Sequence, residues 1–128
     1  MKNPVCWWEI CTKDAGKLAK FYSEAFGWEQ KDMPGMGYTV MDSGDGKNGG
    51  IGGGVFSPKE GEEMPPYLTM YIAVDDVDAT VAKVKELGAT VTCEPFDVPK
   101  VGRIAMFNDP QGHMVGMIKS APMEGESG

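Results

Sequence analysis

The sequence predicts an α+β fold made of two tandem modules, each with the order strand, helix, strand, strand, strand. Two observations support this prediction. Residues 10–15 open a helical pattern that ends near Gly27, and residues 72–77 open a similar pattern that ends near Gly88. In both copies an Asp precedes the helix and a Gly follows it, and these residue types satisfy the unpaired backbone groups of helix ends. A unit that occurs twice in this way indicates duplication of one supersecondary element.

The chain has 128 residues, enough for one domain with a hydrophobic core of its own. We expect a first module over residues 4–56 and a second module over residues 67–119. Residues 57–66, with three prolines and several charges, form the expected linker between them. Residues 120–128 are expected to be a frayed polar tail.

The first module begins with a strand over residues 5–12, whose side chains alternate between two faces. One face carries Val5, Trp7, Glu9 and Cys11, and the other carries Cys6, Trp8, Ile10 and Thr12. Asp14 then caps a helix that ends at Gly27, because apolar residues recur there at helical spacing. The stripe expected to pack on the sheet consists of Leu18, Phe21, Tyr22 and Ala25.

Three further strands complete this module, one beginning at Trp28 and the others covering residues 35–41 and 51–56. A glycine-dense loop, residues 44–50, precedes the last of them. The run over residues 49–54 imitates a phosphate-binding loop, but neither a helix start nor a Lys-Ser or Lys-Thr pair follows it. We therefore expect a flexible loop that enters a strand and tolerates close approach of backbone or ligand.

The second module repeats the plan, with a strand over residues 67–75 and a helix capped by Asp76. The residues of this helix expected to face the sheet are Val77, Val81, Val84 and Leu87. Two strands follow, over residues 90–97 and 103–108. Residues 109–112, with Pro second and Gly fourth, suit a type I turn that leads into a last strand over residues 113–119.

Composition excludes several classes of partner. The net charge of −7 argues against nucleic acid and anionic membranes, because phosphate binding depends on clustered Lys and Arg.

No apolar segment has the length of a signal peptide or of a membrane span. Cys6 and Cys11 lie on one predicted strand about 16 Å apart, beyond disulfide reach. These features predict a protein of the reducing cytoplasm.

Several short motifs point to a known family: residues 21–22, 26–28 and 109–112, together with residues 6–10 and 102–105. In these motifs the chain resembles the vicinal oxygen chelate superfamily, which contains glyoxalases, bleomycin-resistance proteins and extradiol dioxygenases. More narrowly it resembles the small bacterial branch related to lactoylglutathione lyase. The resemblance covers nearly the whole chain. It implies a curled mixed sheet around a shared cavity, helices on the convex side, and a homodimer.

In that superfamily a divalent metal is held by residues of the first and last strands of each module. The register of the resemblance places these positions at Trp7, about Gly53, Thr69 and Gly116. Apart from one weak hydroxyl, none offers a metal-binding side chain. The chain also has a single His, His113, whereas glyoxalase-type and non-haem iron sites combine imidazole with carboxylate. We therefore expect no metal cofactor.

A small-molecule site is expected instead. If the position of Trp7 faces the cavity, alternation places Glu9 and Cys11 there too, and the second module adds residues opposite them. The expected ligand-binding residues are Trp7, Glu9, Cys11, Thr69, Tyr71, Ile104, Met106 and Met114. An apolar wall with a few convergent polar groups is typical of small-molecule sites. This pattern predicts metal-free binding of an apolar or aromatic molecule, with Trp7 and Tyr71 stacking on it.

An enzyme is the alternative. A carboxylate in an apolar cavity can act as a general base, so Glu9 is the catalytic candidate for a lyase or isomerase. A dioxygenase-type enzyme with an atypical divalent metal site is also compatible with the resemblance. Against these stand simpler roles: Glu9 paired with Arg103, Cys11 as a buried thiol, and His113 as an exposed residue at a strand end. Arg103 itself could be a rim anion contact or a surface charge.

Overall fold

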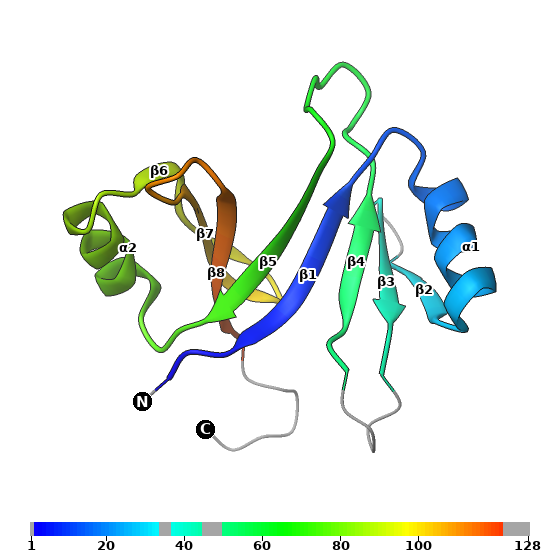
Figure 1. The fold of residues 1–128 in the computed structure, drawn as a ribbon, viewed down its shortest axis with the longest axis horizontal. Coiled ribbons are helices and arrows are strands. Elements are labelled where there is room, and N and C mark those ends of the chain that lie inside the picture. Colours follow the sequence, from blue (N-terminus) through cyan, green and yellow to red (C-terminus); the bar gives the residue numbers. More distant parts are fainter. Residues whose placement is uncertain (1, 34–36, 45–49, 122–128) are drawn as a thin grey trace. The chain divides into compact units, whose positions relative to one another are not determined.

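The computed structural model describes residues 2–33, 37–44 and 50–121 (Figure 1). These residues form two consecutive βαβββ arrangements. The first consists of β1 (Val5–Cys11), α1 (Ala15–Phe26), β2 (Glu29–Met33), β3 (Tyr38–Asp42) and β4 (Gly53–Phe56). The second consists of β5 (Tyr67–Ala73), α2 (Val77–Glu86), β6 (Thr90–Val98), β7 (Gly102–Asn108) and β8 (Met114–Ser120). The predicted fold class is confirmed.

The element boundaries lie within a few residues of the predicted ones. Residues 57–66 contain neither helix nor strand, as expected for a connection. Parts of three sequence-based expectations, at residues 35–36, 45–49 and 122–128, lie outside the described residues. No helix in the described part of the chain is long and apolar enough to cross a membrane.

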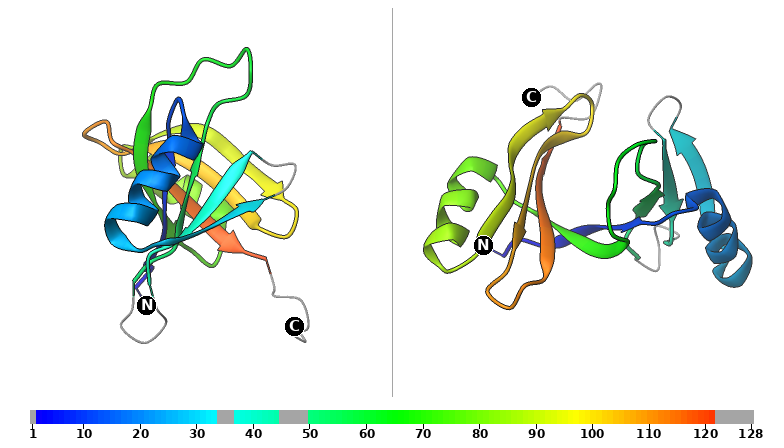
Figure 2. Two further views of the ribbon diagram at one scale, coloured as in Figure 1. Left: turned by 90° about the vertical axis from the view of Figure 1, so that its right-hand side faces the viewer. Right: turned by 90° about the horizontal axis from the view of Figure 1, so that it is seen from above.

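The chain divides into two compact units. The first unit is Cys6–Thr69, and the second combines the described residues before Cys6 with those from Met70 onward. Most of β1 and the start of β5 therefore belong to the first unit. Each unit has its own helix, which covers one face of its strands (Figure 2).

In the first unit the strands lie in the order β2-β3-β4-β1. β4 pairs antiparallel with β3 and parallel with β1, and this register sets Trp8 beside Gly53 and Glu9 beside Gly54. Asp14 caps α1 as predicted, because its carboxylate accepts the Lys17 N–H at 3.0 Å.

The face of α1 that meets the sheet differs from the predicted stripe. Phe21 is 57% exposed and Ala25 is also exposed, so two of the four expected residues do not pack on the sheet. The contact is instead centred on the small residue Ala19, which is 1% exposed and packs beside Met41 and Val55. Other partly buried side chains in this cluster are Trp8, Ile10, Ala15, Leu18, Tyr22 and Trp28. A helix can bury either of two neighbouring stripes, and the smaller side chain allows the closer approach.

The second unit has the strand order β5-β8-β7-β6. β8 pairs parallel with β5 and antiparallel with β7. Asp76 caps α2 as predicted, accepting the Ala79 N–H at 3.0 Å. The buried core of this unit consists of Val74, Val77, Val81, Ala105, Phe107, Val115 and Met117.

One predicted core residue of α2 is wrong. Leu87 is 69% exposed, whereas Val77 and Val81 are buried and Val84 packs against them. The helix ends at Glu86, so Leu87 is the C-cap residue and leaves the helical row that continues the stripe. Gly88 follows at a positive φ of 104°, a conformation that glycine adopts without steric cost.

Candidate functional site

A buried glutamate lies at the centre of the candidate site. Glu9 is on β1 and only 8% exposed. Its carboxylate accepts two phenol hydrogen bonds, one on each oxygen: Tyr38 Oη donates to Oε1 at 3.1 Å, and Tyr67 Oη donates to Oε2 at 2.9 Å. Tyr38 lies on β3 and Tyr67 begins β5, and all three residues belong to the first unit. A buried carboxylate is thus given donors by two strands other than its own.

Two more aromatic side chains complete the arrangement. The Trp7 indole Nε1–H donates to Tyr38 Oη at 2.9 Å. The Phe56 ring stacks on Tyr38 with centroids 5.8 Å apart and meets the edge of Tyr67 at 6.2 Å. We call these five residues, Trp7, Glu9, Tyr38, Phe56 and Tyr67, the tyrosine–glutamate cluster. Packing on Phe56 restricts both phenols, so the orientation of the carboxylate is fixed from two sides.

A glycine makes room for one of these phenols. A Cβ on Gly54 would lie 2.0 Å from Cε1 of Tyr38, so only glycine fits there without displacing the ring. A Cβ on the neighbouring Gly53 would meet the Trp8 ring at 2.0 Å on the other face. The sequence led us to expect close approach of backbone or ligand along this glycine run. The approaching groups are aromatic rings of the chain itself.

Both phenols of the cluster keep their protons at neutral pH. Burial, followed by the nearby charge of Glu9, raises the pKa of Tyr38 and the pKa of Tyr67 well above that of free tyrosine. A protonated phenol donates, and a carboxylate can only accept. The hydrogen bonds from Tyr38 and Tyr67 to Glu9 therefore have a fixed direction.

Cys11, two residues along β1 from Glu9, is a buried thiol. It is 1% exposed. Burial, followed by the charges of Glu9 and Glu62, raises the pKa of the Cys11 thiol. Because the thiolate is the nucleophilic form, this environment opposes a role for Cys11 in covalent catalysis.

The remaining predicted ligand-binding residues lie on β5, β7 and β8. Thr69 is 6% exposed and follows Tyr67 on the same face of β5. In the second unit, Tyr71 lies over Gly116, where an added Cβ would meet the Tyr71 ring at 2.5 Å and Met106 Sδ at 3.0 Å. The register puts four of the predicted residues on one face of this unit's sheet, opposite the face that packs on α2: Tyr71, Ile104, Met106 and Met114.

Four positions of this chain correspond to the metal ligands of the family that it resembles. Trp7 offers an indole, Thr69 a hydroxyl, and Gly116 no side chain. The Cβ direction of Gly53, the fourth position, points at Trp8, and Gly54 is the residue beside Glu9. This donor set does not fit a metal centre of the family's kind. Among the described residues, no three His, Cys, Asp or Glu side chains come together in a way that could hold a metal ion.

Arg103 does not serve as the ion-pair partner suggested for Glu9. Its guanidinium binds Asp78 through Nε at 2.8 Å and Nη2 at 3.0 Å, and Asp97 through Nη1 at 3.2 Å. These contacts tie α2 to β6 and β7 within the second unit. They raise the pKa of Arg103 and lower that of Asp78. Arg103 is thus a partly exposed cation that stabilises the second unit. The suggested ion pair between Glu9 and Arg103 is therefore wrong.

His113 lies at the end of the turn before β8, with a side chain 75% exposed, as expected. Its Nδ1 is 3.1 Å from Asp109 Oδ2, and its backbone N–H donates to Asp109 Oδ1 at 2.9 Å. Asp109 also accepts the Gln111 N–H, and these bonds lower the pKa of the Asp109 carboxyl. The pair therefore stabilises the turn.

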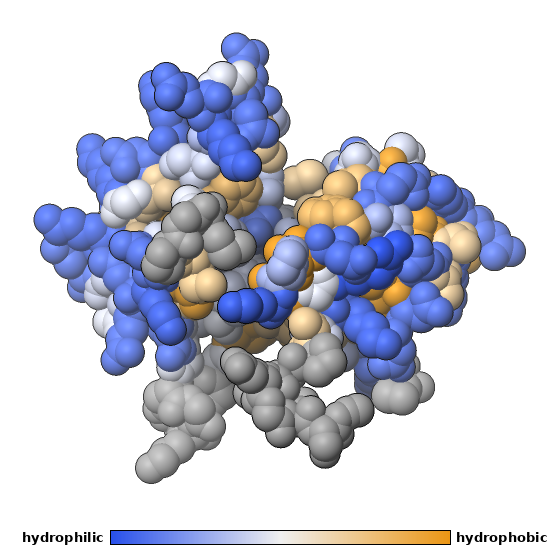
Figure 3. Space-filling model, turned by 180° about the vertical axis from the view of Figure 1, so that it is seen from behind, coloured by the Kyte–Doolittle hydropathy of each residue, from blue (hydrophilic) through white to orange (hydrophobic). Residues whose placement is uncertain are grey.

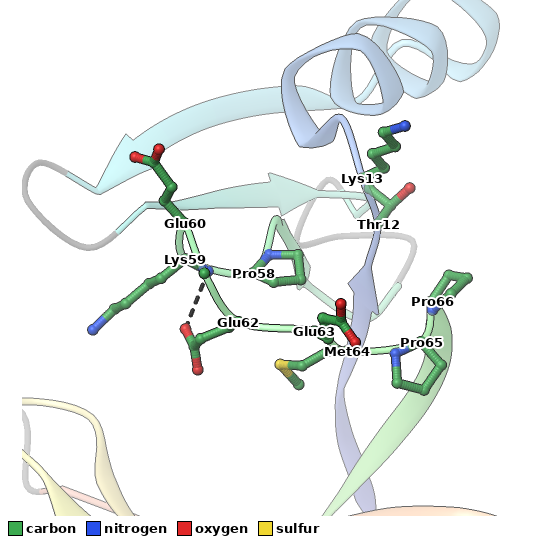
Figure 4. Close-up of a pocket in the computed structure, with 11 residues that line it drawn as sticks. Thr12, Lys13, Pro58, Lys59, Glu60, Glu62, Glu63, Met64, Pro65 and Pro66 are labelled. Atoms are coloured by element: carbon green, nitrogen blue, oxygen red, sulfur yellow. Dashed lines mark hydrogen bonds between the residues drawn. The ribbon is translucent and has the colours of Figure 1, made fainter.

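A pocket that the sequence did not predict lies along the segment between β4 and β5 (Figure 4). It has a volume of about 800 Å³ and is lined by Thr12, Lys13 and residues 58–66. The Lys59 N–H donates to Glu62 Oε1 at 3.1 Å and closes the segment on itself. None of the five cluster residues lines this pocket.

Sequence reasoning missed both phenols of the cluster. Tyr67 could have been found, because alternation along β5 puts it on the same face as Thr69 and Tyr71. Tyr38 could not, because its place depends on the register in which β3 pairs with β4, Tyr38 opposite Phe56. Register is a property of the folded sheet and is not visible in one strand.

Comparison with known proteins identifies the family. The family model described as Glyoxalase/Bleomycin resistance protein/Dioxygenase superfamily matches residues 5–117. A protein of Mycobacterium tuberculosis named "Putative glyoxylase CFP32" is 36% identical over 121 residues, which cover 92% of this chain and 44% of that protein. The anthracycline biosynthesis protein DnrV of Streptomyces peucetius is 32% identical, covering 93% of this chain and 48% of that protein. The chain thus spans less than half the length of these curated relatives.

Solved structures agree in fold at lower sequence identity. Methylmalonyl-CoA epimerase from Mycobacterium tuberculosis superposes with a TM-score of 0.65 at 15% identity, covering 92% of this chain and 88% of that chain. A hypothetical protein from Bacillus halodurans superposes with a TM-score of 0.72 at 15% identity, covering 98% of this chain and 100% of that chain. At this identity the likeness establishes the fold alone.

The first prediction concerns the glycine under Tyr38. Gly54→Ala should displace the Tyr38 ring and lower the free energy of unfolding by about 1–3 kcal/mol, the usual cost of overpacking. Urea denaturation measures the loss. Gly16→Ala in α1 is the control, because the nearest atom to its added Cβ is Asp14 Oδ1 at 3.8 Å. Equal stability of the two variants would contradict this account of Gly54.

The second prediction concerns alkaline pH. An unfolded tyrosine loses its proton at pH about 10, whereas the folded phenols of the cluster retain theirs, so unfolding is favoured as pH rises. Above pH about 10, each such phenol contributes a slope of up to about −1.4 kcal/mol per pH unit in unfolding free energy, and less for the partly exposed Tyr67. Urea denaturation between pH 9 and about 11 measures this slope. Tyr38→Phe should make it shallower, and an unchanged slope would show that Tyr38 titrates normally.

Proposed function

Because the chain belongs to the glyoxalase/bleomycin resistance protein/dioxygenase superfamily, we propose that it binds an apolar or aromatic small molecule at the tyrosine–glutamate cluster without a metal ion. The observation that supports this most is the buried carboxylate of Glu9, held by two phenols on an aromatic wall. A wall of this composition, with one oriented polar group, is the usual form of a small-molecule site.

The aromatic residues determine which ligands fit. Trp7, Tyr38, Phe56 and Tyr67 are each partly exposed, so their rings offer surface to a ligand as well as packing on one another. Flat apolar molecules gain most from such rings, because stacked and edge-on contacts add to the burial of apolar area. Glu9 supplies the single polar contact that orients the ligand. Binding of this kind requires no additional chemistry from the chain.

The absence of a metal is part of the proposal and is supported by the donor set. The residues at the family's ligand positions are an indole, a hydroxyl and glycine, and Glu9 already accepts two phenol hydrogen bonds. Chemistry that depends on a divalent ion, including glyoxalase and dioxygenase activity, therefore has little support in these residues.

An enzyme that uses Glu9 as a general base is the second candidate. It is favoured by the fixed orientation of the carboxylate, since a base must be held at hydrogen-bond distance from the proton that it removes. The reaction would be an isomerisation or elimination that begins with loss of a C–H proton next to a carbonyl. Deuterium incorporation from heavy water into a bound carbon acid, lost in Glu9→Gln while binding persists, would favour this candidate over simple binding.

Two further parts of the proposal concern assembly and location. We expect a homodimer in the cytoplasm. Apolar side chains are available for association: Phe21 and Phe26 on α1 are 57% and 62% exposed, and Leu68 on β5 is 71% exposed. Apolar patches among hydrophilic side chains are also visible on the face of the molecule in Figure 3. Exposed apolar groups of this size are common in protein interfaces.

The test is a screen of flat aromatic compounds, followed by the NMR signal of the Trp7 indole N–H. Compounds that bind should shift this signal, with the same affinity before and after dialysis against a chelator. Trp7→Leu should weaken binding at least about tenfold by removing the stacking surface, as measured by isothermal titration calorimetry, because this variant has no Trp7 indole signal. Phe96→Leu is the matched control, because it removes a 44% exposed ring on β6, outside both the cluster and the surface proposed for the dimer. Binding that survives Trp7→Leu, or that disappears on chelation, would contradict the proposal.

A further inference from the structure

The hydrogen bonds of the cluster run in one direction, and chemistry fixes that direction. An indole N–H can only donate, so Tyr38 Oη is the acceptor in its 2.9 Å contact with Trp7. A carboxylate can only accept, so Tyr38 is the donor in its 3.1 Å contact with Glu9 Oε1. The same reasoning makes Tyr67 the donor in its 2.9 Å contact with Oε2. No other assignment of the three hydrogens is consistent with these contacts.

This direction leaves the cluster without a donor to offer. The polar hydrogens of the Trp7, Tyr38 and Tyr67 side chains are all engaged within the cluster. The acceptor atoms of the cluster are all oxygens, and those of Glu9 carry the charge. A ligand that can only accept hydrogen bonds would have to break one of these contacts and leave a buried oxygen of Glu9 with one donor fewer. A ligand that donates would leave all of them in place.

We infer that the small molecule bound at this cluster is a hydrogen-bond donor, and specifically an aromatic amine, amidine or similar nitrogen cation. This inference rests on the proposed function, since it names the class of ligand for the same site. Carboxylates, phosphates and quinones are disfavoured because they present only acceptors. The net charge of −7 also favours a cationic ligand, because it raises the local concentration of cations.

The aromatic wall supports a cation independently. A cationic group within about 6 Å of an aromatic ring face is attracted by the ring, and tryptophan and tyrosine are the strongest partners. Trp7, Tyr38 and Tyr67 surround the carboxylate that would pair with the same group. Rings and carboxylate therefore favour one ligand chemistry, a flat apolar body with a nitrogen cation attached.

Three probes built on the same naphthalene ring test the inference: 2-naphthamidinium, 2-methylnaphthalene and 2-naphthoate. Each is titrated into the full chain, with the shift of the Trp7 indole signal as the readout. We expect the amidinium to bind at least about tenfold more tightly than the naphthoate, as hydrogen bonds to a charged group imply. Equal affinity of all three at Trp7 would overturn the inference and leave the proposed function intact. No Trp7 shift with any probe would overturn both.

Two variants separate the cluster from general charge. In Glu9→Gln the new amide N–H would donate to a phenol oxygen and release that phenol's O–H, so the preference for the amidinium should vanish or reverse. Glu86→Gln, which removes the same charge from the exposed end of α2, should keep it. A preference that persists in Glu9→Gln would overturn the inference. Tyr67→Phe, which keeps the carboxylate, should still favour the amidinium, and a switch to naphthoate would overturn it as well.

Discussion

The burial of one carboxylate constrains the architecture of the first unit. A charged group that is 8% exposed must be given hydrogen-bond donors, or its burial costs several kcal/mol. Tyr38 and Tyr67 supply those donors from two other strands. Gly54 is needed beneath Tyr38 because any larger residue would displace the ring. Gly54 of β4 and the two phenols, Tyr38 and Tyr67, thus serve a single polar group on β1.

Much of the fold was predictable because local signals decide it. The caps at Asp14 and Asp76, the alternation along β1 and the order of elements are each set by residues close in sequence. The predicted helix stripes failed at Phe21 and Leu87, where burial depends on which neighbouring stripe meets the sheet and where the helix stops. The residues that β1 contributes to the site were predictable, and the two phenols were missed. The family resemblance places Trp7, and alternation from it identifies Glu9, but Tyr38 enters through strand register, which one sequence does not reveal.

Membership of the superfamily establishes the fold and leaves the chemistry to individual residues. Where other members are expected to hold a metal, this chain has an indole, a hydroxyl and two glycines, and its glycines accommodate aromatic rings. The same scaffold thus presents a carboxylate among phenols. The charged pairs of the second unit, Arg103 with Asp78 and Asp97, stabilise the scaffold and leave Glu9 as the polar centre of the candidate site.

We expect the tyrosine–glutamate cluster to act without a metal ion. Elemental analysis of the untagged protein, purified without chelator, tests this claim directly. The measurement covers nickel, zinc, iron, manganese and cobalt per chain, before and after incubation with each ion. We expect no near-stoichiometric metal in either state. A near-stoichiometric ion that is lost in Glu9→Gln would contradict the account and assign Glu9 to a metal centre.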